Sequence, residues 1–355
     1  MKITVIGTGY VGLVSGACFS EFGFEVTCID KDKKKIDALN KGNPLIYEPG
    51  LESLVKKNMK TGRLKFQNSF TDNIKKSQII LIAVGTPTQR NGHANLEHVF
   101  DAAKQVAPLL SGYTVVVNKS TVPVGTAKRV FSILKKNQRN ADFDVASNPE
   151  FLREGSAIED FMRPNRVVIG VDSLKAKRIM KELYRPLFLI ETPIIFTSPQ
   201  TAELIKYASN AFLATKITFI NQIADLCEKS GADVHDVAKS MGLDKRIGDK
   251  FLHPGPGFGG SCFPKDNLEL AATARALGSP IGLIEEVISF NKSRKKKMAR
   301  KIILACGNNV KGKKIAILGL TFKPNTDDMR DSPSLDIIPA LQKAGAKIQA
   351  YDPEG

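Results

Sequence analysis

The sequence contains no tryptophan, only four histidines, and five cysteines spread along 355 residues. Because the cysteines are widely spaced and odd in number, they indicate neither a disulfide framework nor a Cys-x-x-Cys metal site. The histidines are not paired at ligand spacing either, so we expect no bound metal. The five cysteines are Cys18, Cys28, Cys227, Cys262 and Cys306.

Long apolar runs are also missing. No stretch approaches the roughly 20 residues that cross a bilayer. An apolar run begins at residue 2, which leaves no room for a signal peptide. With 42% hydrophobic and 25% charged residues, the chain has the composition of a globular protein of two or three domains. We therefore expect a cytoplasmic protein with no membrane partner.

The charge is strongly positive, with a formal net value of +16 at pH 7. Lysine and arginine gather in short runs at 31–35, 293–301 and 311–314. These runs contain no interleaved aromatic residues and no recognition-helix signature, so we expect no nucleic-acid partner. The same positive field favours binding of an anionic small molecule.

The first residues carry the fingerprint of a dinucleotide-binding fold. Lys2–Ile6 is an apolar β-rich run, followed by Gly7, Gly9 and Gly12 in the spacing G-x-G-x-x-G and by a helical pattern to Phe22. In this motif the first glycine makes a tight turn and the second lets a pyrophosphate reach the helix amino terminus. The third allows the helix to pack closely on the strand.

A second predicted strand, Glu25–Ile29, ends at Asp30. An acid at this place accepts hydrogen bonds from ribose hydroxyls, and it would repel a 2′-phosphate, so NAD is favoured over NADP. Lys35 lies close enough in sequence to weaken that preference. Strand, helix, strand and terminal acid together predict an NAD-binding domain.

More strands and crossover helices follow up to about residue 195, as in an α/β fold with a doubly wound parallel sheet. Buried parallel strands are expected at 79–84, 114–118, 144–147 and 166–171, and helices at 95–110 and 126–136.

Ligands should gather at the carboxyl ends of these strands. Hydroxyls and carboxylates stand there in three loops, where a bound nicotinamide would lie. Thr86, Ser120 and Thr121 are explained equally well as turn or cap residues. The loops are expected at 85–88, 120–125 and 148–154.

A long helical pattern from 198 to about 230 begins an all-helical middle. At about 1.5 Å per residue this helix is long for a single small domain, so we expect it to link domains. Lys206 and Asn210 are four residues apart and share one face of it. Further helices are expected at 230–241, 267–277 and 281–300.

Cys262 stands in the segment 257–266, GFGGSCFPKD. Buried structural cysteines usually lie among packed hydrophobes, whereas this one follows glycines that let a ligand approach the backbone closely. Lys265 is near enough to favour the thiolate. The segment predicts a reactive thiol, and the alternative is a glycine-rich turn that happens to contain a small hydrophobe.

The last segment repeats the opening pattern, with a strand at 313–318, a helix at 333–344 and a strand at 347–351. Two strands are too few for an independent doubly wound domain, so we expect a continuation after Gly355. We expect residues 1–197 to form the NAD-binding domain. Residues 198–305 form a helical domain, and residues 306–355 begin a second Rossmann-like domain.

Seven motifs occur in one order and resemble those of the nucleotide-sugar dehydrogenases. The resemblance covers essentially the whole chain. It implies an NAD-binding domain, a central helical domain that builds a homodimer and a carboxyl-terminal domain that binds the UDP-sugar. The motifs are GTGYVG, VGTPT, STVPVGT, NPEFLREG, ELIKYASNAF, GFGGSCFPKD and GLTFKPNTDDMRDSP.

The resemblance implies oxidation of a primary alcohol to an acid, with two hydride transfers to NAD and an aldehyde between them. Cys262 would attack the aldehyde to give a thiohemiacetal, and the thioester formed next would be hydrolysed. The residues around the cysteine favour UDP-glucose as substrate over GDP-mannose or a UDP-N-acetylhexosamine. A catalytically inactive NAD- or nucleic-acid-binding regulator is the alternative from another class.

The other catalytic residues are also implied by the resemblance. Lys206 and Asn210 match positions that stabilise negative charge on oxygen. Asp266 and Thr121 match residues that hold the catalytic water. Glu150 matches a general acid or base, which would need a raised pKa to work near neutrality.

Binding residues follow in the same way. Arg246 resembles an arginine that the neighbouring subunit supplies, which implies at least a dimer. The implied NAD contacts are Gly7, Gly9, Tyr10, Val11, Gly12, Asp30, Lys35, Thr86, Thr121, Glu154, Lys265 and Arg330. The implied substrate contacts are Glu150, Phe151, Leu152, Arg153, Glu154, Lys206, Asn210, Arg246, Phe251, Leu252, His253, Pro254, Gly255, Gly259 and Lys323.

Overall fold

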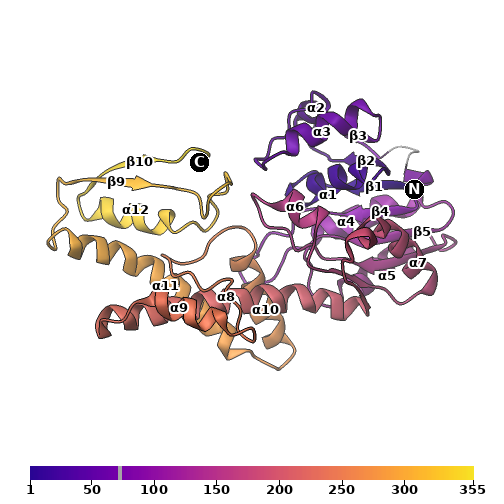
Figure 1. Ribbon diagram of the computed structural model, residues 1–355. Coiled ribbons are helices and arrows are strands. Elements are labelled where there is room, and N and C mark those ends of the chain that lie inside the picture. Colours follow the sequence, from indigo (N-terminus) through magenta and orange to yellow (C-terminus); the bar gives the residue numbers. More distant parts are fainter. Residues whose placement is uncertain (71–73) are drawn as a thin grey trace. The chain divides into compact units, whose positions relative to one another are not determined.

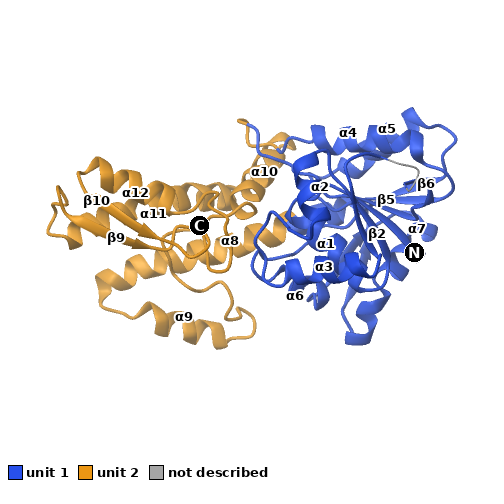
Figure 2. Ribbon diagram, turned by 90° about the horizontal axis from the view of Figure 1, so that it is seen from above, with its two compact units in different colours: residues 1–89, 94–206 blue, residues 90–93, 207–355 orange. Residues whose placement is uncertain are grey.

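The computed structural model describes residues 1–70 and 74–355, which divide into two compact units (Figure 2). Unit 1 comprises residues 1–89 and 94–206, and unit 2 comprises residues 90–93 and 207–355. The division falls inside one long helix, α8 (Pro199–Ser230), which confirms the helix expected there.

Unit 1 is built on an eight-stranded sheet with the order β3-β2-β1-β4-β5-β6-β7-β8 (Figure 1). All residues of β4 and β5 are buried, as expected for apolar runs covered on both faces. The strand order reverses between β1 and β4, so their carboxyl ends flank the crevice where such folds bind ligands. The strands are β1 (Lys2–Ile6), β2 (Glu25–Ile29), β3 (Leu64–Gln67), β4 (Ile79–Ile82), β5 (Thr114–Asn118), β6 (Phe143–Ser147), β7 (Val167–Gly170) and β8 (Ile194–Thr197).

Helices cover both faces of this sheet, which confirms the doubly wound α/β fold. Side chains of α1, α3, α6 and α7 pack on one face around Phe19, whose ring centroid lies 4.9 Å from that of Phe161. Side chains of α4 and α5 pack on the other face. The helices are α1 (Tyr10–Glu21), α2 (Lys33–Asn40), α3 (Leu51–Lys60), α4 (Glu97–Val106), α5 (Thr126–Asn137), α6 (Ala157–Met162) and α7 (Leu174–Leu183), with short 3₁₀ turns η1 (Ile74–Lys76), η2 (Ala107–Leu109) and η3 (Arg185–Ile190).

One strand direction differs from the sequence prediction. β7 was expected to be parallel to the other strands, but it pairs antiparallel with β6 through Ser147 and Gly170. A parallel return would have to carry the chain back past a five-residue strand, about 17 Å. Residues 148–166 contain one short helix, the six-residue α6, and no crossover helix that returns the chain to the amino edge of the sheet, so the chain enters β7 from the carboxyl edge of β6.

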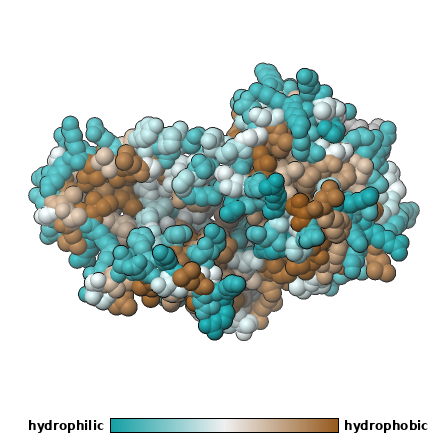
Figure 3. All heavy atoms as spheres, in the orientation of Figure 1, coloured by the Kyte–Doolittle hydropathy of each residue, from teal (hydrophilic) through white to brown (hydrophobic). Residues whose placement is uncertain are grey.

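Unit 2 combines long helices with a small parallel sheet. β9 and β10 pair in parallel and α12 connects them, which confirms the expected start of a second β-α-β unit. Apolar side chains gather over this two-stranded sheet, at the left of Figure 3. Besides α8, the elements are α9 (Val234–Leu243), α10 (Phe263–Ala276), α11 (Gly282–Ala305), β9 (Lys314–Leu318), α12 (Ser334–Lys343) and β10 (Lys347–Tyr351).

The start of α10 also differs from the prediction. The helix begins at Phe263 rather than at residue 267, because Pro264 stands in its first turn, where the fixed φ of proline favours helix initiation. This shift makes Cys262 the N-cap of α10 and places Asp266 in the first turn.

Within residues 1–70 and 74–355 we find no helix that combines the length and the apolar composition needed to span a membrane.

Glu203 fixes the beginning of α8 on unit 1. Its side chain is 2% exposed and accepts hydrogen bonds from the Gly125 N–H at 2.6 Å, the Ala127 N–H at 2.9 Å and the Ser147 hydroxyl at 2.9 Å. Burial raises the pKa of Glu203, and these donors oppose that shift. One carboxylate thus joins α8 to the amino end of α5 and to the carboxyl end of β6.

Candidate functional site

The glycine loop after β1 has the geometry that a dinucleotide requires. A Cβ on Gly12 would lie 2.0 Å from the Gly7 carbonyl oxygen, so the turn closes only with glycine there. A Cβ on Gly9 would meet no atom of the described residues within 4 Å, which leaves open space beside the helix. In the described part of the chain, no side chain caps α1 and no acid stands in its first turn. The free amides and the helix dipole suit a pyrophosphate, so these residues fit the expected NAD.

Asp30 lies at the end of β2, beside the glycine loop. One of its carboxylate oxygens accepts from the N–H and the hydroxyl of Thr8, both at 2.8 Å. Burial alone would raise the pKa of Asp30, but the Asp32 and Thr8 hydrogen bonds and the charge of Lys35 outweigh it and hold the pKa below its usual range. Asp30 is therefore an ionised acceptor, as recognition of ribose hydroxyls requires.

Two of the expected loops meet at the carboxyl ends of β4 and β5. The Thr86 hydroxyl donates to the Thr121 carbonyl oxygen at 3.0 Å, and the Ser120 hydroxyl donates to the Val84 carbonyl oxygen at 2.7 Å. The structure thus brings Thr86 and Thr121 together and gives Ser120 the turn-stabilising role that was its alternative.

Lys206 and Glu150 form a buried ion pair. The ammonium lies 3.0 Å from the carboxylate, and their side chains are 3% and 4% exposed. Burial alone would raise the pKa of Glu150, but Lys206, the Leu152 N–H and Lys119 outweigh it and hold the pKa below its usual range. The expectation of a raised pKa at Glu150 is therefore wrong for this arrangement. Glu150 is a carboxylate, which suits a proton acceptor.

Lys119 belongs to this charge cluster, although the sequence analysis did not single it out. Its ammonium donates to the Asn148 side-chain oxygen at 3.1 Å and to the Tyr184 hydroxyl at 3.3 Å. Burial lowers the pKa of Lys119 to about 8, opposed by the charge of Glu150 and assisted by that of Lys206. Its signal in the sequence was a lysine placed directly after the three consecutive valines and Asn118 of strand β5. Lys119, Asn148, Glu150 and Tyr184 line one pocket of unit 1.

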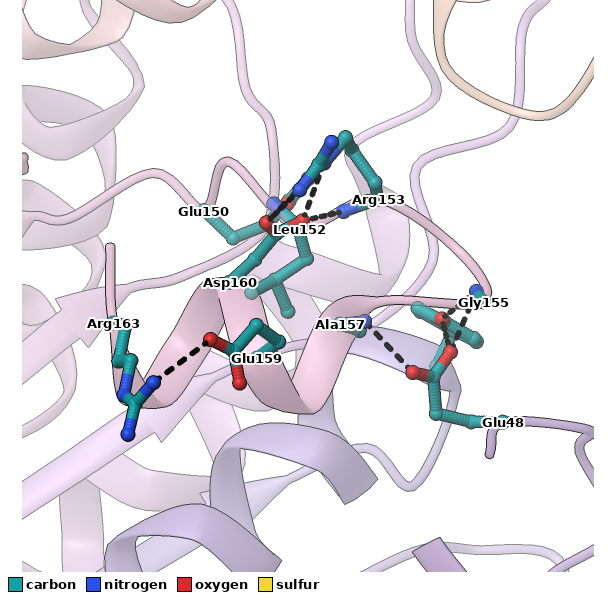
Figure 4. Close-up of polar contacts among 10 residues, drawn as sticks. Glu48, Glu150, Leu152, Arg153, Gly155, Ala157, Glu159, Asp160 and Arg163 are labelled. Carbon is teal, nitrogen blue, oxygen red and sulfur yellow. Dashed lines mark hydrogen bonds and ion pairs between the residues drawn. The ribbon is translucent and has the colours of Figure 1, made fainter. Parts of the chain in front are cut away.

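Of the other expected residues in the 148–154 loop, Phe151 and Leu152 line this pocket. The ring of Phe151 is stacked under the Arg166 guanidinium, 3.7 Å from its centre, and lies 5.4 Å from the Lys206 ammonium. The guanidinium of Arg153 binds both oxygens of Asp160, at 2.6 and 2.9 Å, so this arginine is turned toward α6 (Figure 4).

Unit 2 carries the cysteine and its polar neighbours. Cys262 is partly exposed at the N-cap of α10, where the helix end carries a partial positive charge. Asp266 is 1% exposed, and its two oxygens accept from the Lys265 ammonium at 2.7 Å and from the Asn210 side-chain amide at 2.6 Å. Asn210, Lys265 and Asp266, to which the sequence analysis gave separate roles, thus form one hydrogen-bonded cluster.

Two other cysteines show what distinguishes Cys262. Cys18 and Cys28 are completely buried in the core of unit 1. Burial raises the pKa of both thiols, that of Cys28 to about 12. They are structural cysteines, whereas Cys262 is a partly exposed residue at a helix terminus.

Two asparagines hold the loop 251–260, which contains most of the expected substrate contacts of unit 2. Asn291 accepts from the Phe258 N–H at 2.8 Å and donates to the Phe258 carbonyl oxygen at 3.0 Å. Asn221 accepts from the Gly255 N–H at 2.8 Å. Sequence reasoning missed both residues, although an asparagine within the apolar stripe of a helix was an available signal.

The glycines before Cys262 pack against the GLTFKPNTDDMRDSP motif. A Cβ on Gly259 would lie 2.4 Å from the Asp331 carbonyl oxygen. The Gly260 N–H donates to the Arg330 carbonyl oxygen at 2.7 Å. Two motifs that are separate in sequence are therefore in contact, and glycine is required for that contact.

Three expected cations of unit 2 lie on the surface or in ion pairs. Arg246 is paired with Asp244 at 2.6 Å, and its side chain is 90% exposed. Arg330 is paired with Asp328 at 2.8 Å. The Lys323 ammonium lies 5.5 Å from the ring centre of the preceding phenylalanine.

Comparison with known proteins identifies relatives over the whole chain. Models of the UDP-glucose/GDP-mannose dehydrogenase family match in three parts, the NAD binding domain at residues 1–188, the central domain at 200–293 and the UDP binding domain at 316–355. A UDP-glucose 6-dehydrogenase of Rhizobium meliloti is 58% identical, with 100% of this chain and 82% of the relative covered. A UDP-glucose 6-dehydrogenase of Bacillus subtilis is 55% identical, with 99% and 76% covered.

A solved structure agrees with these sequences. The UDP-glucose dehydrogenase of Pyrobaculum islandicum matches with a TM-score of 0.94 at 38% identity, and the match covers 99% of this chain and 82% of that one.

The lowered pKa of Lys119 predicts a pH-dependent stability. Below pH 8 the folded and unfolded chains both hold this proton, and between about 8 and the ordinary lysine value of 10.5 only the unfolded chain holds it. The free energy of unfolding should then rise with pH by about 1.4 kcal/mol per unit, relative to Lys119→Met. Urea unfolding from pH 7 to 9.5 measures this difference.

The exposed lysine of α5 gives a matched control, since Lys128→Met should show no comparable slope against wild type. A wild-type minus Lys119→Met difference that stays flat or falls above pH 8 would show that Lys119 is not held in this way.

Proposed function

Because the chain belongs to the UDP-glucose/GDP-mannose dehydrogenase family, we propose that it is an NAD-dependent UDP-glucose 6-dehydrogenase with Cys262 as its nucleophile. The reaction converts UDP-glucose, two NAD⁺ and one water into UDP-glucuronate, two NADH and protons. The observation that carries the proposal is the likeness of the whole chain to UDP-glucose 6-dehydrogenases, of which 82% and 76% is covered. The partly exposed thiol at the head of α10, beside Asp266, supports the covalent route.

The first oxidation converts the C6 alcohol to an aldehyde. When bound, NAD⁺ accepts the hydride in each of the two oxidations. The alcohol proton needs an acceptor, and Glu150 is suited to this because its neighbours keep it ionised. The ammonium of Lys206 and the amide of Asn210 stabilise negative charge that develops on the C6 oxygen.

The second oxidation takes place on the enzyme. The Cys262 sulfur adds to the aldehyde carbon, and the former carbonyl oxygen takes a proton, which gives a thiohemiacetal. Loss of its carbon-bound hydride to NAD⁺ and of its hydroxyl proton to a base leaves a thioester. Water then attacks the thioester carbon and the thiolate departs, so the carboxylic acid is released and the thiol is regenerated. Asp266 and Thr121 are assigned to the water.

We assign cofactor contacts to unit 1 and UDP-sugar contacts to loops of both units. Gly7, Gly9, Gly12 and Asp30 hold the cofactor, and the open space beside Gly9 supports this assignment. The loops 150–154 and 251–255 bind the UDP-sugar.

A homodimer in the cytosol completes the proposal. Phe212, Phe219 and Leu226 of α8 are 65%, 45% and 60% exposed, and a spacing of seven residues puts them on one face of the helix. Exposed aromatic and aliphatic side chains in such a row favour contact with a second copy of the chain. Arg246, whose side chain is largely exposed, is then available to the partner's site.

An NADH assay with several nucleotide sugars tests the function. UDP-glucose should yield two NADH per molecule, because both oxidations occur before product release. GDP-mannose and UDP-N-acetylhexosamines should react much more slowly. Absence of turnover with every nucleotide sugar by the folded protein would sink the proposal.

The same assay tests the nucleophile with Cys262→Ser, which should still bind NAD but lose steady-state NADH production by at least about a thousandfold. Cys306→Ser is the matched control, since Cys306 is also a partly exposed cysteine of unit 2, and it should keep wild-type turnover. Wild-type turnover in Cys262→Ser would exclude the covalent mechanism.

The dimer is tested with Phe219→Asp, which places a charge in the exposed row of α8. In sedimentation or light-scattering measurements we expect this variant to have the mass of a monomer. The control variant Leu304→Asp changes an exposed residue of α11 and should keep the wild-type mass. A wild-type chain that is monomeric at micromolar concentration, or a Phe219→Asp variant of unchanged mass, would contradict this interface.

A further inference from the structure

Carboxylates hold the backbone of the loop 150–157 in place (Figure 4). The Leu152 N–H donates to the Glu150 side chain at 2.5 Å, and the Arg153 N–H donates to the Asp160 side chain at 2.8 Å. Both acceptors are close in sequence to the amides that they bind. Hydrogen bonds to ionised acceptors are stronger than those between neutral groups, so they fix the path of the loop.

A third carboxylate reaches the same loop from far away in the sequence. Glu48 accepts from the Gly155 N–H and from the Ala157 N–H, both at 2.7 Å, and the first of these bonds joins residues 107 positions apart. Glu48 is 6% exposed and stands just before α3. Its carboxylate therefore holds the backbone of the second half of the loop, at Gly155 and Ala157.

Glu48 also contacts the dinucleotide-binding helix. The Tyr10 hydroxyl donates to the Glu48 oxygen that binds Gly155, and the Gly155 N–H lies 3.1 Å from the Tyr10 oxygen. Tyr10 is the first residue of α1 and directly follows Gly9. The three groups form a closed triangle between the amino end of α1 and the loop.

The hydroxyl of Tyr10 keeps its proton in this triangle. Burial raises the pKa of Tyr10, and the hydrogen bond to Glu48 raises it further, so the hydroxyl remains a donor across the working pH range. The contact therefore depends on where Tyr10 stands and not on its ionisation.

A pyrophosphate bound to the first amides of α1 would hold that turn still, and Tyr10 is part of it. A fixed Tyr10 hydroxyl in turn holds the Glu48 carboxylate, on which two loop amides depend. We infer that Glu48 is a positioning residue that makes the order of the loop 150–157 depend on the cofactor bound at α1. The inference rests on the proposed function for the identity of the two ligands.

By linkage, the coupling is reciprocal, so a sugar nucleotide that orders the loop also strengthens cofactor binding. The first ligand removes part of the ordering cost that the second would otherwise bear.

Hydrogen exchange of the Gly155 and Ala157 amides, with and without saturating NAD, tests the coupling directly. In wild type, NAD should slow exchange of both amides about tenfold, as expected when one charge-assisted hydrogen bond becomes persistent. In Tyr10→Phe the ring stays and the link to Glu48 is lost, so NAD should slow these amides by less than about twofold.

Tyr113→Phe is the matched control. Tyr113 also donates its hydroxyl to a carboxylate, that of Asp144 at 2.5 Å, but neither residue belongs to a ligand loop. NAD should slow the two loop amides in this variant as in wild type. Equal slowing in Tyr10→Phe and Tyr113→Phe, or no effect of NAD on these amides in wild type, would overturn the inference.

A kinetic measurement separates positioning from a general structural role. A glutamine at residue 48 has one acceptor oxygen for three donors, so Glu48→Gln should raise the KM for UDP-glucose about tenfold and change kcat by less than about threefold. A loss confined to kcat would contradict the positioning role.

Failure of the inference and failure of the proposed function have different signatures. NAD-dependent protection in a wild-type chain that releases no NADH from any nucleotide sugar would refute the function alone. Full UDP-glucose turnover, together with protection that survives Tyr10→Phe, would refute the inference alone.

Discussion

The buried ion pair between Lys206 and Glu150 is the interaction on which the ligand-binding face of unit 1 depends. A lone ammonium or carboxylate at this depth would be strongly destabilising, so each group requires the other. The pair fixes where α8 must begin relative to β6, and Glu203 secures that position through the amino end of α5. Replacement by apolar residues usually costs little stability, so the chemistry, not the folding energy, explains why the charges are there.

Carboxylates, more than apolar contacts, set the paths of the ligand loops. Loop amides lack the regular partners of helices and sheets, and each buried one needs an acceptor. Glu48, Asp160 and Glu203 provide acceptors in unit 1, and each binds a segment that a sequence motif places at the carboxyl edge of the sheet. In unit 2, the Asp266 carboxylate joins the side chains of Asn210, a candidate catalytic residue, and Lys265, a candidate NAD contact. A rigid sheet and a few buried acids thus combine to hold flexible segments in one conformation.

Local patterns predicted most of the fold, and long-range contacts account for what they missed. The strands Lys2–Ile6 and Thr114–Asn118 agree with the sequence prediction to the residue, because a run of β-forming residues bounded by turn residues can be recognised from the sequence alone. The direction of β7 follows from the lack of a crossover helix in residues 148–166, which the periodicity of the strand itself does not report. The roles of Glu48 and Lys119 depend on partners that are distant in sequence. The sequence alone does not distinguish a buried acid or lysine from a solvated one. The motifs predicted the candidate cysteine and glycine residues, but not the side chains that position them.

Turnover of the double variant Lys206→Met with Glu150→Gln tests most directly whether the buried pair exists for chemistry. The substitutions remove both partners of the ion pair together. Lys119 then loses the opposing charge of Glu150, but burial already lowers its pKa to about 8, so it can release its proton and the chain should still fold. We expect the folded variant to oxidise UDP-glucose at least about a thousandfold more slowly than wild type, because the proton acceptor and the fixed cation are both lost. A folded double variant whose turnover stays within tenfold of wild type would contradict the central role given to this pair.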